Sequence, residues 1–398
     1  MRTLWTVRAA LALLLTACAP KPADVVLYNA RVYTLSWAEP ATDGTPAADA
    51  PFDARSGWRP DASAIAIRDG YIVYVGSDSV ALSLAGEGTD RRDLAGATVV
   101  PGLVDAHTHV AEWGASLDRL DLTGVPDEAT AIQKVVERAA AVPAGTWILG
   151  QGWDDGAWAD RYPTRQKLSA AVPNHPVVLR GLHGFATWVN DAALAAAKIT
   201  AETPNPSGGE IQRDRTGAAT GLLLNRAVAI LDAAVPPPTP AQQDSQIVRA
   251  LRRMAALGYT SVHEAGTSAE VTAALERLAT AQKLPIRVYA MLSARDPVLM
   301  RTWVERGPRT ATGAPDEMLA VRAVKAYYDG ALGSRGAALL DDYSDRPGVR
   351  GVAGETYGFD RSLVGAAMAA GFQVGIHAIG DQGNRDALNY IDSVFRLA

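Results

Sequence analysis

The second half of the sequence alternates amphipathic helical stretches with short apolar runs, and this alternation limits the folds that the chain can adopt. The spacing of apolar residues predicts helices over 241–257, 269–282, 298–304, 361–370 and 382–395. The runs between them predict strands over 259–263, 286–291, 320–327 and 372–377. Alternation of this kind favours right-handed βαβ units, and therefore a parallel sheet. The apolar run 99–105, typical of a strand buried on both faces, adds a fifth strand.

The residues before this pattern indicate two further regions. From 24 to 98 the periodicity is mostly two, and Ala64–Gly76 has the pattern of a hairpin with Asp69-Gly70 as its turn. We therefore expect a small β-domain over 24–98, with a surface loop rich in Ala, Asp, Gly and Pro over 37–60. Residues 111–240 are the least regular part of the chain and are interpreted as an insertion.

Composition excludes several classes of protein. The 398 residues are 48% hydrophobic, which is ample for a large core and rules out wholesale disorder. Lys and Arg total 38 against 43 Asp and Glu, so the net charge is −5, and no basic block occurs. This balance argues against non-specific nucleic-acid binding. The single cysteine, Cys18, excludes an intramolecular disulfide and a zinc site built from several cysteines.

The first 18 residues have the layout of a secretory signal. Two arginines precede a short apolar run, which ends in Leu15-Thr16-Ala17-Cys18 and resembles a bacterial lipobox. Lipidation of Cys18 would leave residues 19–23 as a tether and anchor the protein to a membrane by lipid alone. Ala19 favours the outer membrane, facing the periplasm. The alternative is an ordinary secretory signal with an incidental cysteine.

The sharpest chemical signal is the pair His107 and His109, at the end of the apolar run 99–105. Side chains two residues apart on a strand point to the same face, so both imidazoles can approach one ion. Imidazole nitrogen suits Zn²⁺ and similar divalent metals. A His-x-His pair alone is a weak motif, and two structural histidines are the alternative. The preceding Val-Val-Pro-Gly-Leu-Val-Asp-Ala makes the signal far more specific.

Several separate segments together resemble one known family. Val100–His109 resembles the first-strand signature of the amidohydrolase superfamily. Lys325–Arg335 and Gly375–Asp381 resemble the branch that contains N-substituted formamide deformylases. Shorter segments with the same resemblance are Gly152–Asp154, Pro163–Arg165 and Gly208–Ile211. The resemblance extends from about residue 24 to the last residue.

The resemblance implies an α/β fold, a (β/α)₈ TIM barrel beside a small β-sandwich built from both chain ends. Residues 24–98 would then form the N-terminal part of the sandwich. Residues 99–398 would form an incomplete barrel with about five of its eight units, so the chain resembles a C-terminally truncated family member.

The resemblance also implies a metal centre. Its ligands map to His107, His109, Lys325 and His377, around one or two divalent ions, with Zn²⁺ expected. The family's fourth-strand lysine is often carboxylated, and Lys325 stands at that position. A lysine at the end of a buried apolar strand needs a partner or must lose its charge, and a carbamate would make it an anionic ligand. The alternative is an ion pair with a nearby carboxylate such as Asp329.

Two weaker candidates could contact a substrate. His263 closes the second predicted barrel strand, and Arg335 lies on the loop after the fourth. His263 is as consistent with a structural histidine, and Arg335 with a loop arginine held in an ion pair. Both are kept as substrate-binding candidates.

The implied activity is hydrolysis of a non-peptide, amide-type C–N bond of a small molecule by a metal-activated hydroxide. Relatives use an Asp after the eighth strand to move the proton and a His ligand from the sixth. The sequence contains neither segment, so no general base is assigned. An ester, lactone or phosphoester hydrolase on the same barrel is one alternative, and an inactive or metal-binding periplasmic lipoprotein is another. The sequence leaves the substrate and the oligomeric state, a homo-oligomer included, open.

We predict that residues 19–398 expressed alone are poorly soluble and inactive. The physical reason is that an open barrel leaves apolar parallel strands unpaired at its edge. Size-exclusion chromatography and a metal-supplemented turnover assay check this prediction. A soluble, cooperatively unfolding preparation with metal-dependent turnover would contradict it.

Overall fold

The structure is a computed structural model that describes residues 21–397, apart from 155–157, 159–161, 183–185, 207–208, 226, 311–313, 315 and 333–334. The chain divides into two compact units. The first contains residues up to 105 together with 258–261 and 310–318, and the second contains 106–257, 262–309 and 319 onward. Within the described residues, no helix is long and apolar enough to cross a membrane.

The first unit is built on a four-stranded sheet in the order β6-β5-β1-β7. Its strands are β1 (Ala23–Tyr28), β5 (Ala64–Arg68), β6 (Tyr71–Gly76) and β7 (Ala85–Asp93). Helix α2 (Asp78–Ser83) places Ala81 in a small core with Val26 and Ala66. Short strand pairs accompany this sheet: β2 (Arg31–Val32) with β8 (Thr98–Val99), and β3 (Phe52–Asp53) with β4 (Gly57–Trp58).

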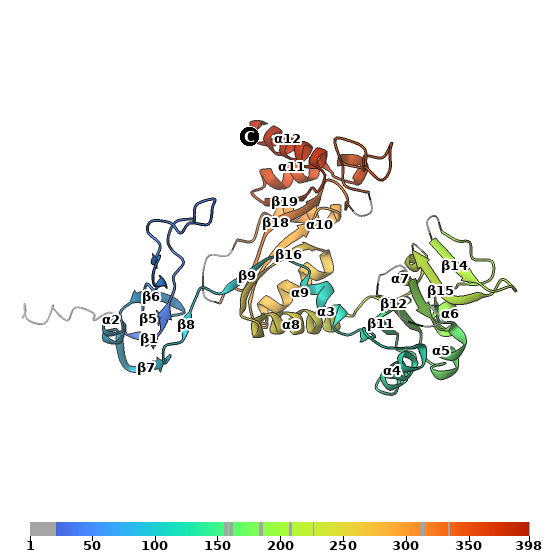
Figure 1. The fold of residues 1–398 in the computed structure, drawn as a ribbon, viewed down its shortest axis with the longest axis horizontal. Helices are drawn as coiled ribbons and strands as arrows, with labels where there is room; N and C mark the ends of the chain where they lie inside the picture. Colours follow the sequence, from blue (N-terminus) through green and yellow to red (C-terminus); the bar gives the residue numbers. More distant parts are fainter. Residues whose placement is uncertain are drawn as a thin grey trace, which may run out of the picture. The chain divides into compact units, whose positions relative to one another are not determined.

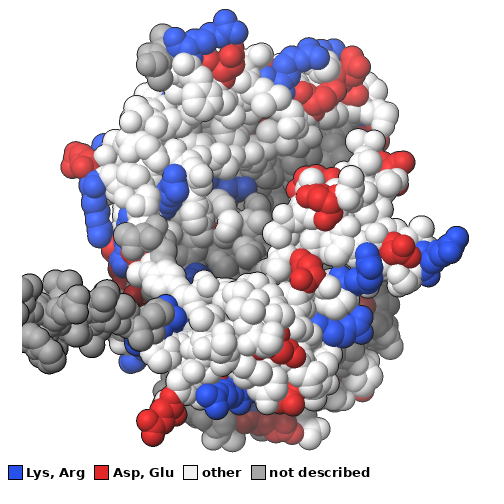
Figure 2. Space-filling view, turned by 90° about the vertical axis from the view of Figure 1, so that its left-hand side faces the viewer, with Lys and Arg blue, Asp and Glu red and all other residues white. Residues whose placement is uncertain are grey.

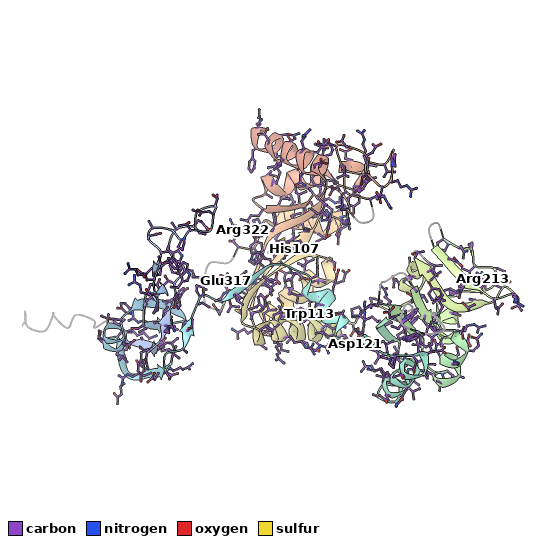
Figure 3. The ribbon with its side chains drawn as sticks, in the orientation of Figure 1. His107, Trp113, Asp121, Arg213, Glu317 and Arg322 are labelled. Carbon is purple, nitrogen blue, oxygen red and sulfur yellow. The ribbon has the colours of Figure 1, made fainter. Side chains whose placement is uncertain are left out.

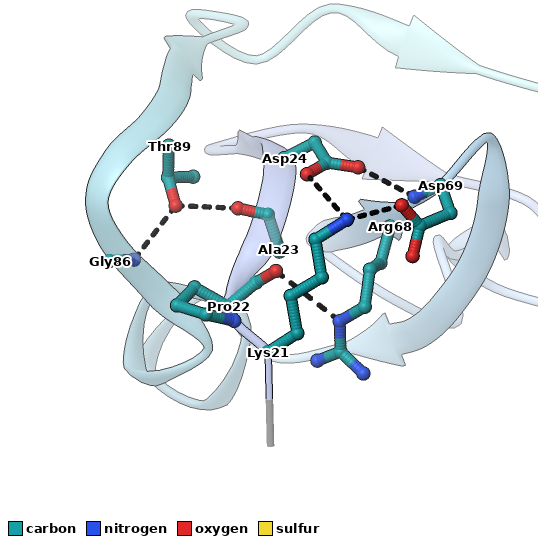
Figure 4. A network of polar contacts seen from close by, with 8 residues as sticks. All are labelled: Lys21, Pro22, Ala23, Asp24, Arg68, Asp69, Gly86 and Thr89. Atoms are coloured by element: carbon teal, nitrogen blue, oxygen red, sulfur yellow. Dashed lines mark hydrogen bonds and ion pairs between the residues drawn. The ribbon is translucent and has the colours of Figure 1, made fainter. Parts of the chain in front are cut away.

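The turn between β5 and β6 confirms the predicted hairpin. Asp69 and Gly70 both have positive φ, 50° and 79°, as a two-residue type I′ turn requires. The turn is tied to the start of β1, because the Asp69 amide donates to Asp24 at 2.6 Å and Lys21 binds both carboxylates (Figure 4).

Residues 120–225 form a six-stranded mixed sheet in the order β10-β11-β12-β13-β15-β14, which the sequence did not predict. Its strands are β10 (Leu120–Asp121), β11 (Ile148–Trp153), β12 (Val177–Gly181), β13 (Ala186–Val189), β14 (Gly209–Arg213) and β15 (Ala219–Asn225). Helices α4 (Glu128–Ala140), α5 (Arg165–Ala171), α6 (Asp191–Ala196) and α7 (Val228–Asp232) accompany it. Successive residues such as Trp188 and Val189 enter two different apolar clusters, so the sheet is covered on both faces.

The predicted strand–helix alternation forms a parallel half-barrel sheet in the order β19-β18-β17-β16-β9 (Figure 1). Its strands are β9 (Leu103–Thr108), β16 (Tyr259–Thr267), β17 (Arg287–Ser293), β18 (Leu319–Tyr327) and β19 (Gln373–His377). Its helices are α3 (Val110–Ser116), α8 (Pro240–Ala256), α9 (Ala269–Thr280), α10 (Pro297–Arg306), α11 (Arg361–Ala369) and α12 (Asp381–Leu397). The TIM-barrel class predicted from the sequence is therefore confirmed, with five strands.

The two faces of this sheet differ in chemistry. Ala326 and Ile376 belong to the apolar cluster that contains Val364 of α11 and Tyr390 of α12. Because side chains alternate along a strand, Lys325 and His377 point to the opposite face. The helices therefore cover one face, and the polar candidates lie on the other.

One prediction about the first barrel strand is wrong. The run 99–105 does not form a strand buried on both faces: Val99 pairs in β8, and β9 begins only at Leu103. Leu103 and Val104 are 52% and 53% exposed. The physical reason is that β9 is an edge strand: in the part of the chain that the structure describes, its neighbour in the sheet is β16 alone.

Helix α8 begins with a capping box, which offers a test of the fold. The Thr239 hydroxyl accepts a hydrogen bond from the Gln242 amide at 3.4 Å, and the Gln242 side chain accepts one from the Thr239 amide at 2.9 Å. Thr239→Ala should lower the free energy of unfolding by about 1 kcal/mol. Thr302→Ala, in the exposed middle of α10, should change it by less than about 0.5 kcal/mol. Urea unfolding measures the free energy of unfolding of both variants. Equal losses would contradict a stabilising role of the capping box at Thr239.

Candidate metal centre

The candidate metal ligands lie at or near the carboxyl ends of the half-barrel strands, whereas His263 lies in the middle of β16. Parallel pairing places Ser293 opposite Lys325, and Tyr327 opposite His377. His107 lies near the end of β9 (Figure 3). Active sites of TIM barrels form at this end, because the loops that follow the strands gather there.

His107 and His109 approach one another as the sequence predicts, with ring centroids 5.5 Å apart. His109 is no longer in the strand, since β9 ends at Thr108 and His109 is the residue that caps α3. The turn between strand and helix therefore decides where the second imidazole lies.

A buried carboxylate, that of Glu264 on β16, holds this turn. It accepts hydrogen bonds from the backbone amides of Val110 and Ala111, the first residues of α3. The Thr108 hydroxyl donates to the His263 carbonyl at 3.0 Å, which ties the end of β9 to the same strand. Glu264 is 6% exposed, and burial raises the pKa of its carboxyl group. The sequence did not single out Glu264, because its partners are about 150 residues away.

Lys325 is buried, with 7% of its surface exposed. Its alkyl chain runs toward β16, where a Cβ at Gly266 would stand 3.6 Å from the Lys325 Cγ. Its ammonium lies 5.4 Å from the centre of the Tyr327 ring. Burial lowers the pKa of Lys325, which favours the neutral amine that a carbamate requires.

The alternative of an ion pair between Lys325 and Asp329 is wrong for the described residues. Asp329 is fully buried, and its carboxylate accepts hydrogen bonds from the amides of Ala338, Ile379 and Gly380 at 2.8–2.9 Å. Its Oδ1 also lies 3.8 Å from His377 Nε2. Asp329 thus joins the segment after β18 to the turn after β19 and lies beside the candidate ligand His377.

The two substrate-binding candidates have other contacts. The His263 ring lies 4.7 Å from the Tyr289 ring, on the neighbouring strand. Arg335 forms an ion pair with Asp345 at 2.6 Å, and both side chains are exposed. A contact of either residue with substrate stays a prediction.

The donor set fits a divalent metal in its chemistry. Imidazole nitrogens are ordinary Zn²⁺ ligands, and a carboxylated lysine would add oxygen. Among the described residues, no three His, Cys, Asp or Glu side chains lie close enough to hold one ion. In the sheet order, β16 and β17 separate β9, which carries His107, from the strands of Lys325 and His377. Joint ligation by His107, His109, Lys325 and His377 stays a prediction.

Residues 91–397 match the amidohydrolase family. The chain belongs to this family. It is 32% identical over 341 residues to YtcJ of Bacillus subtilis, covering 83% of this chain and 62% of that protein. It is 32% identical over 240 residues to N-substituted formamide deformylase of Arthrobacter pascens, covering 58% of this chain and 44% of that enzyme.

Two solved structures have a fold similar to that of this chain. An uncharacterized metal-dependent hydrolase from Pyrococcus furiosus matches with a TM-score of 0.71 and 25% identity, covering 93% of this chain and 70% of that one. A metal-dependent hydrolase from Pyrococcus horikoshii matches with a TM-score of 0.69. The chain spans 62% of YtcJ and 58% of LONG AFTER FAR-RED 3 from Arabidopsis thaliana. The predicted family and fold are confirmed.

The predictions for the N-terminus fall outside the structure. Cys18 and the signal segment lie outside the described residues. Lipidation at Cys18, and the periplasmic location that it implies, stay predictions.

The packing around Asp329 predicts an unusual effect of a glycine substitution. Gly383 lies in α12, where alanine normally favours the helix, but a Cβ there would stand 2.3 Å from Asp329 Oδ2. Gly383→Ala should therefore lower the free energy of unfolding by about 1–3 kcal/mol and reduce metal retention.

Gly375→Ala, on the neighbouring strand β19, is the matched control. A Cβ there meets its first neighbour at 3.8 Å, so the stability of this variant should stay close to that of the unchanged protein. Thermal unfolding of both variants measures the difference in stability, and metal analysis measures the loss of metal from Gly383→Ala. A stabilised Gly383→Ala variant would contradict the role given to Asp329.

Proposed function

We propose that the protein is a metal-dependent hydrolase that cleaves a non-peptide, amide-type C–N bond of a small molecule. The observation that carries the proposal is Lys325, a buried lysine at the carboxyl end of a half-barrel strand, without an acidic partner among the described residues. A buried ammonium is unfavourable unless it is paired or loses its charge. Ligation of a metal, directly or as a carbamate, removes that cost.

His107, His109, Lys325 and His377 would hold one or two divalent ions, with Zn²⁺ as the expected metal. A metal in this position, when bound, lowers the pKa of water and polarises a substrate carbonyl. Glu264 keeps the turn that carries His109 in place, through the amides of Val110 and Ala111.

Asp329 does the same for the turn after His377, through the amides of Ile379 and Gly380. Its 3.8 Å approach to His377 Nε2 suits a carboxylate that orients a ligand imidazole. Both turns would therefore be held by carboxylates that are not among the four proposed metal ligands.

The choice of a C–N bond rests on the relatives. N-substituted formamide deformylase is one of the proteins that this chain resembles, and its name specifies removal of a formyl group from nitrogen. The metal centre itself does not separate amides from esters, because the bond that is cleaved depends on how the loops bind the substrate.

The test uses the complete gene product, purified without chelators. We expect bound divalent metal by elemental analysis, and faster turnover of N-substituted formamides and other non-peptide amides than of matched esters. Lys325→Gln should lose metal and reduce turnover at least about a hundredfold, because it removes a ligand. Lys283→Gln, an exposed lysine, is the control and should change neither.

Two outcomes would overturn the proposal. Absence of metal together with no turnover would favour the inactive lipoprotein. Turnover of esters, lactones or phosphoesters alone would assign the barrel to that class of hydrolase.

A further inference from the structure

One arginine stands beside the candidate metal centre in an unusual setting. Arg295 follows β17 and precedes α10, so it lies at the carboxyl end of the sheet. Its guanidinium carbon is 3.9 Å from the centre of the Tyr327 ring and 5.7 Å from that of Tyr357. Stacking of this kind fixes the plane of a guanidinium and leaves its N–H edge available.

Tyr327 connects this arginine to the predicted metal ligands. The same ring lies 5.4 Å from the Lys325 ammonium and 5.7 Å from the His377 ring. The guanidinium is therefore separated from both ligands by a single aromatic side chain. One small substrate could therefore contact both Arg295 and the candidate metal centre.

Arg295 has no acidic partner among the described residues. The acid beside it in the sequence, Asp296, accepts hydrogen bonds from the amides of Val298 and Leu299 and so caps α10. By contrast, Arg335 pairs with Asp345, and Arg306 with Glu276.

We propose that Arg295 binds a carboxylate of the substrate, so that the enzyme prefers amides of molecules that carry an acid group. This inference rests on the proposed function for the hydrolysis, but the binding of a carboxylate by Arg295 does not depend on it. A guanidinium presents two parallel donors that match the two oxygens of a carboxylate. One guanidinium supplies one positive charge, which suits a singly charged carboxylate better than a phosphate dianion.

The alternative is that Arg295 only holds the Tyr327 ring in place. A purely structural role would affect all substrates alike, whereas a binding role depends on the charge of the substrate. Pairs of substrates that differ in this charge alone therefore separate the two explanations.

The kinetic experiment uses N-formyl amino acids with a free carboxylate and their neutral methylamides. The complete, metal-loaded protein should prefer the free acids. Arg295→Gln should raise KM for the acids about tenfold or more, leave kcat within about twofold, and leave the methylamides unchanged. Arg295→Lys should restore little, since an ammonium does not bind a carboxylate in the same bidentate way.

Arg306→Gln is the matched control, because Arg306 also stacks on an aromatic ring, Trp303 at 4.3 Å, but lies at the far end of α10 and is paired with Glu276. It should leave the preference for acids unchanged. Equal losses for acids and methylamides in Arg295→Gln, or no preference in the unchanged protein, would overturn the inference.

A binding measurement separates this inference from the proposed function. Calorimetry with phenylacetate on the metal-stripped protein should show binding that Arg295→Gln weakens about tenfold and Arg306→Gln leaves intact. Binding without any turnover would refute the hydrolase and keep the carboxylate site. Turnover with phenylacetate binding that does not depend on Arg295 would refute the carboxylate site alone.

Discussion

The structure depends on the alternation of side chains along the half-barrel strands. On β18 the period of two sends Ala326 toward α11 and α12, and Lys325 to the opposite face. Apolar burial against the helices fixes the register of the strand, because a slip by one residue would exchange the two faces. The apolar burial that stabilises the core therefore also places Lys325 on the opposite face, where its positive charge needs a partner or must be lost.

Two buried carboxylates hold the turns that follow two of the half-barrel strands. Glu264 binds backbone amides after β9, and Asp329 binds backbone amides after β19. Each satisfies donors that would otherwise be unpaired at the start of a helix or in a tight turn. On the face drawn in Figure 2, acidic and basic side chains are interspersed, in keeping with the small net charge. The two carboxylates that hold the turns are, by contrast, buried.

The sequence predicts those parts of the fold whose signal is local. Helices α8 to α12 and strands β16 to β19 have strong periodicity, and the Asp69-Gly70 turn has the residues that positive φ requires. The six-stranded sheet was missed because β13 has only four residues and β14 contains polar residues, so neither has a strong strand pattern. The roles of Glu264 and Asp329 were missed because most of their hydrogen-bond partners are distant in sequence.

The two arginines Arg335 and Arg295 have contacts that their local sequence does not reveal. Arg335 stands in a family-like segment, and nothing local indicates its pairing with Asp345 ten residues later. Arg295 precedes Asp296, a carboxylate that the sequence alone offers as its ion-pair partner. The proline at the start of α10 changes this, because the helix begins there and its free amides take the Asp296 carboxylate. Helix capping thus leaves the guanidinium to the tyrosines, at the end of the sheet where a substrate would bind.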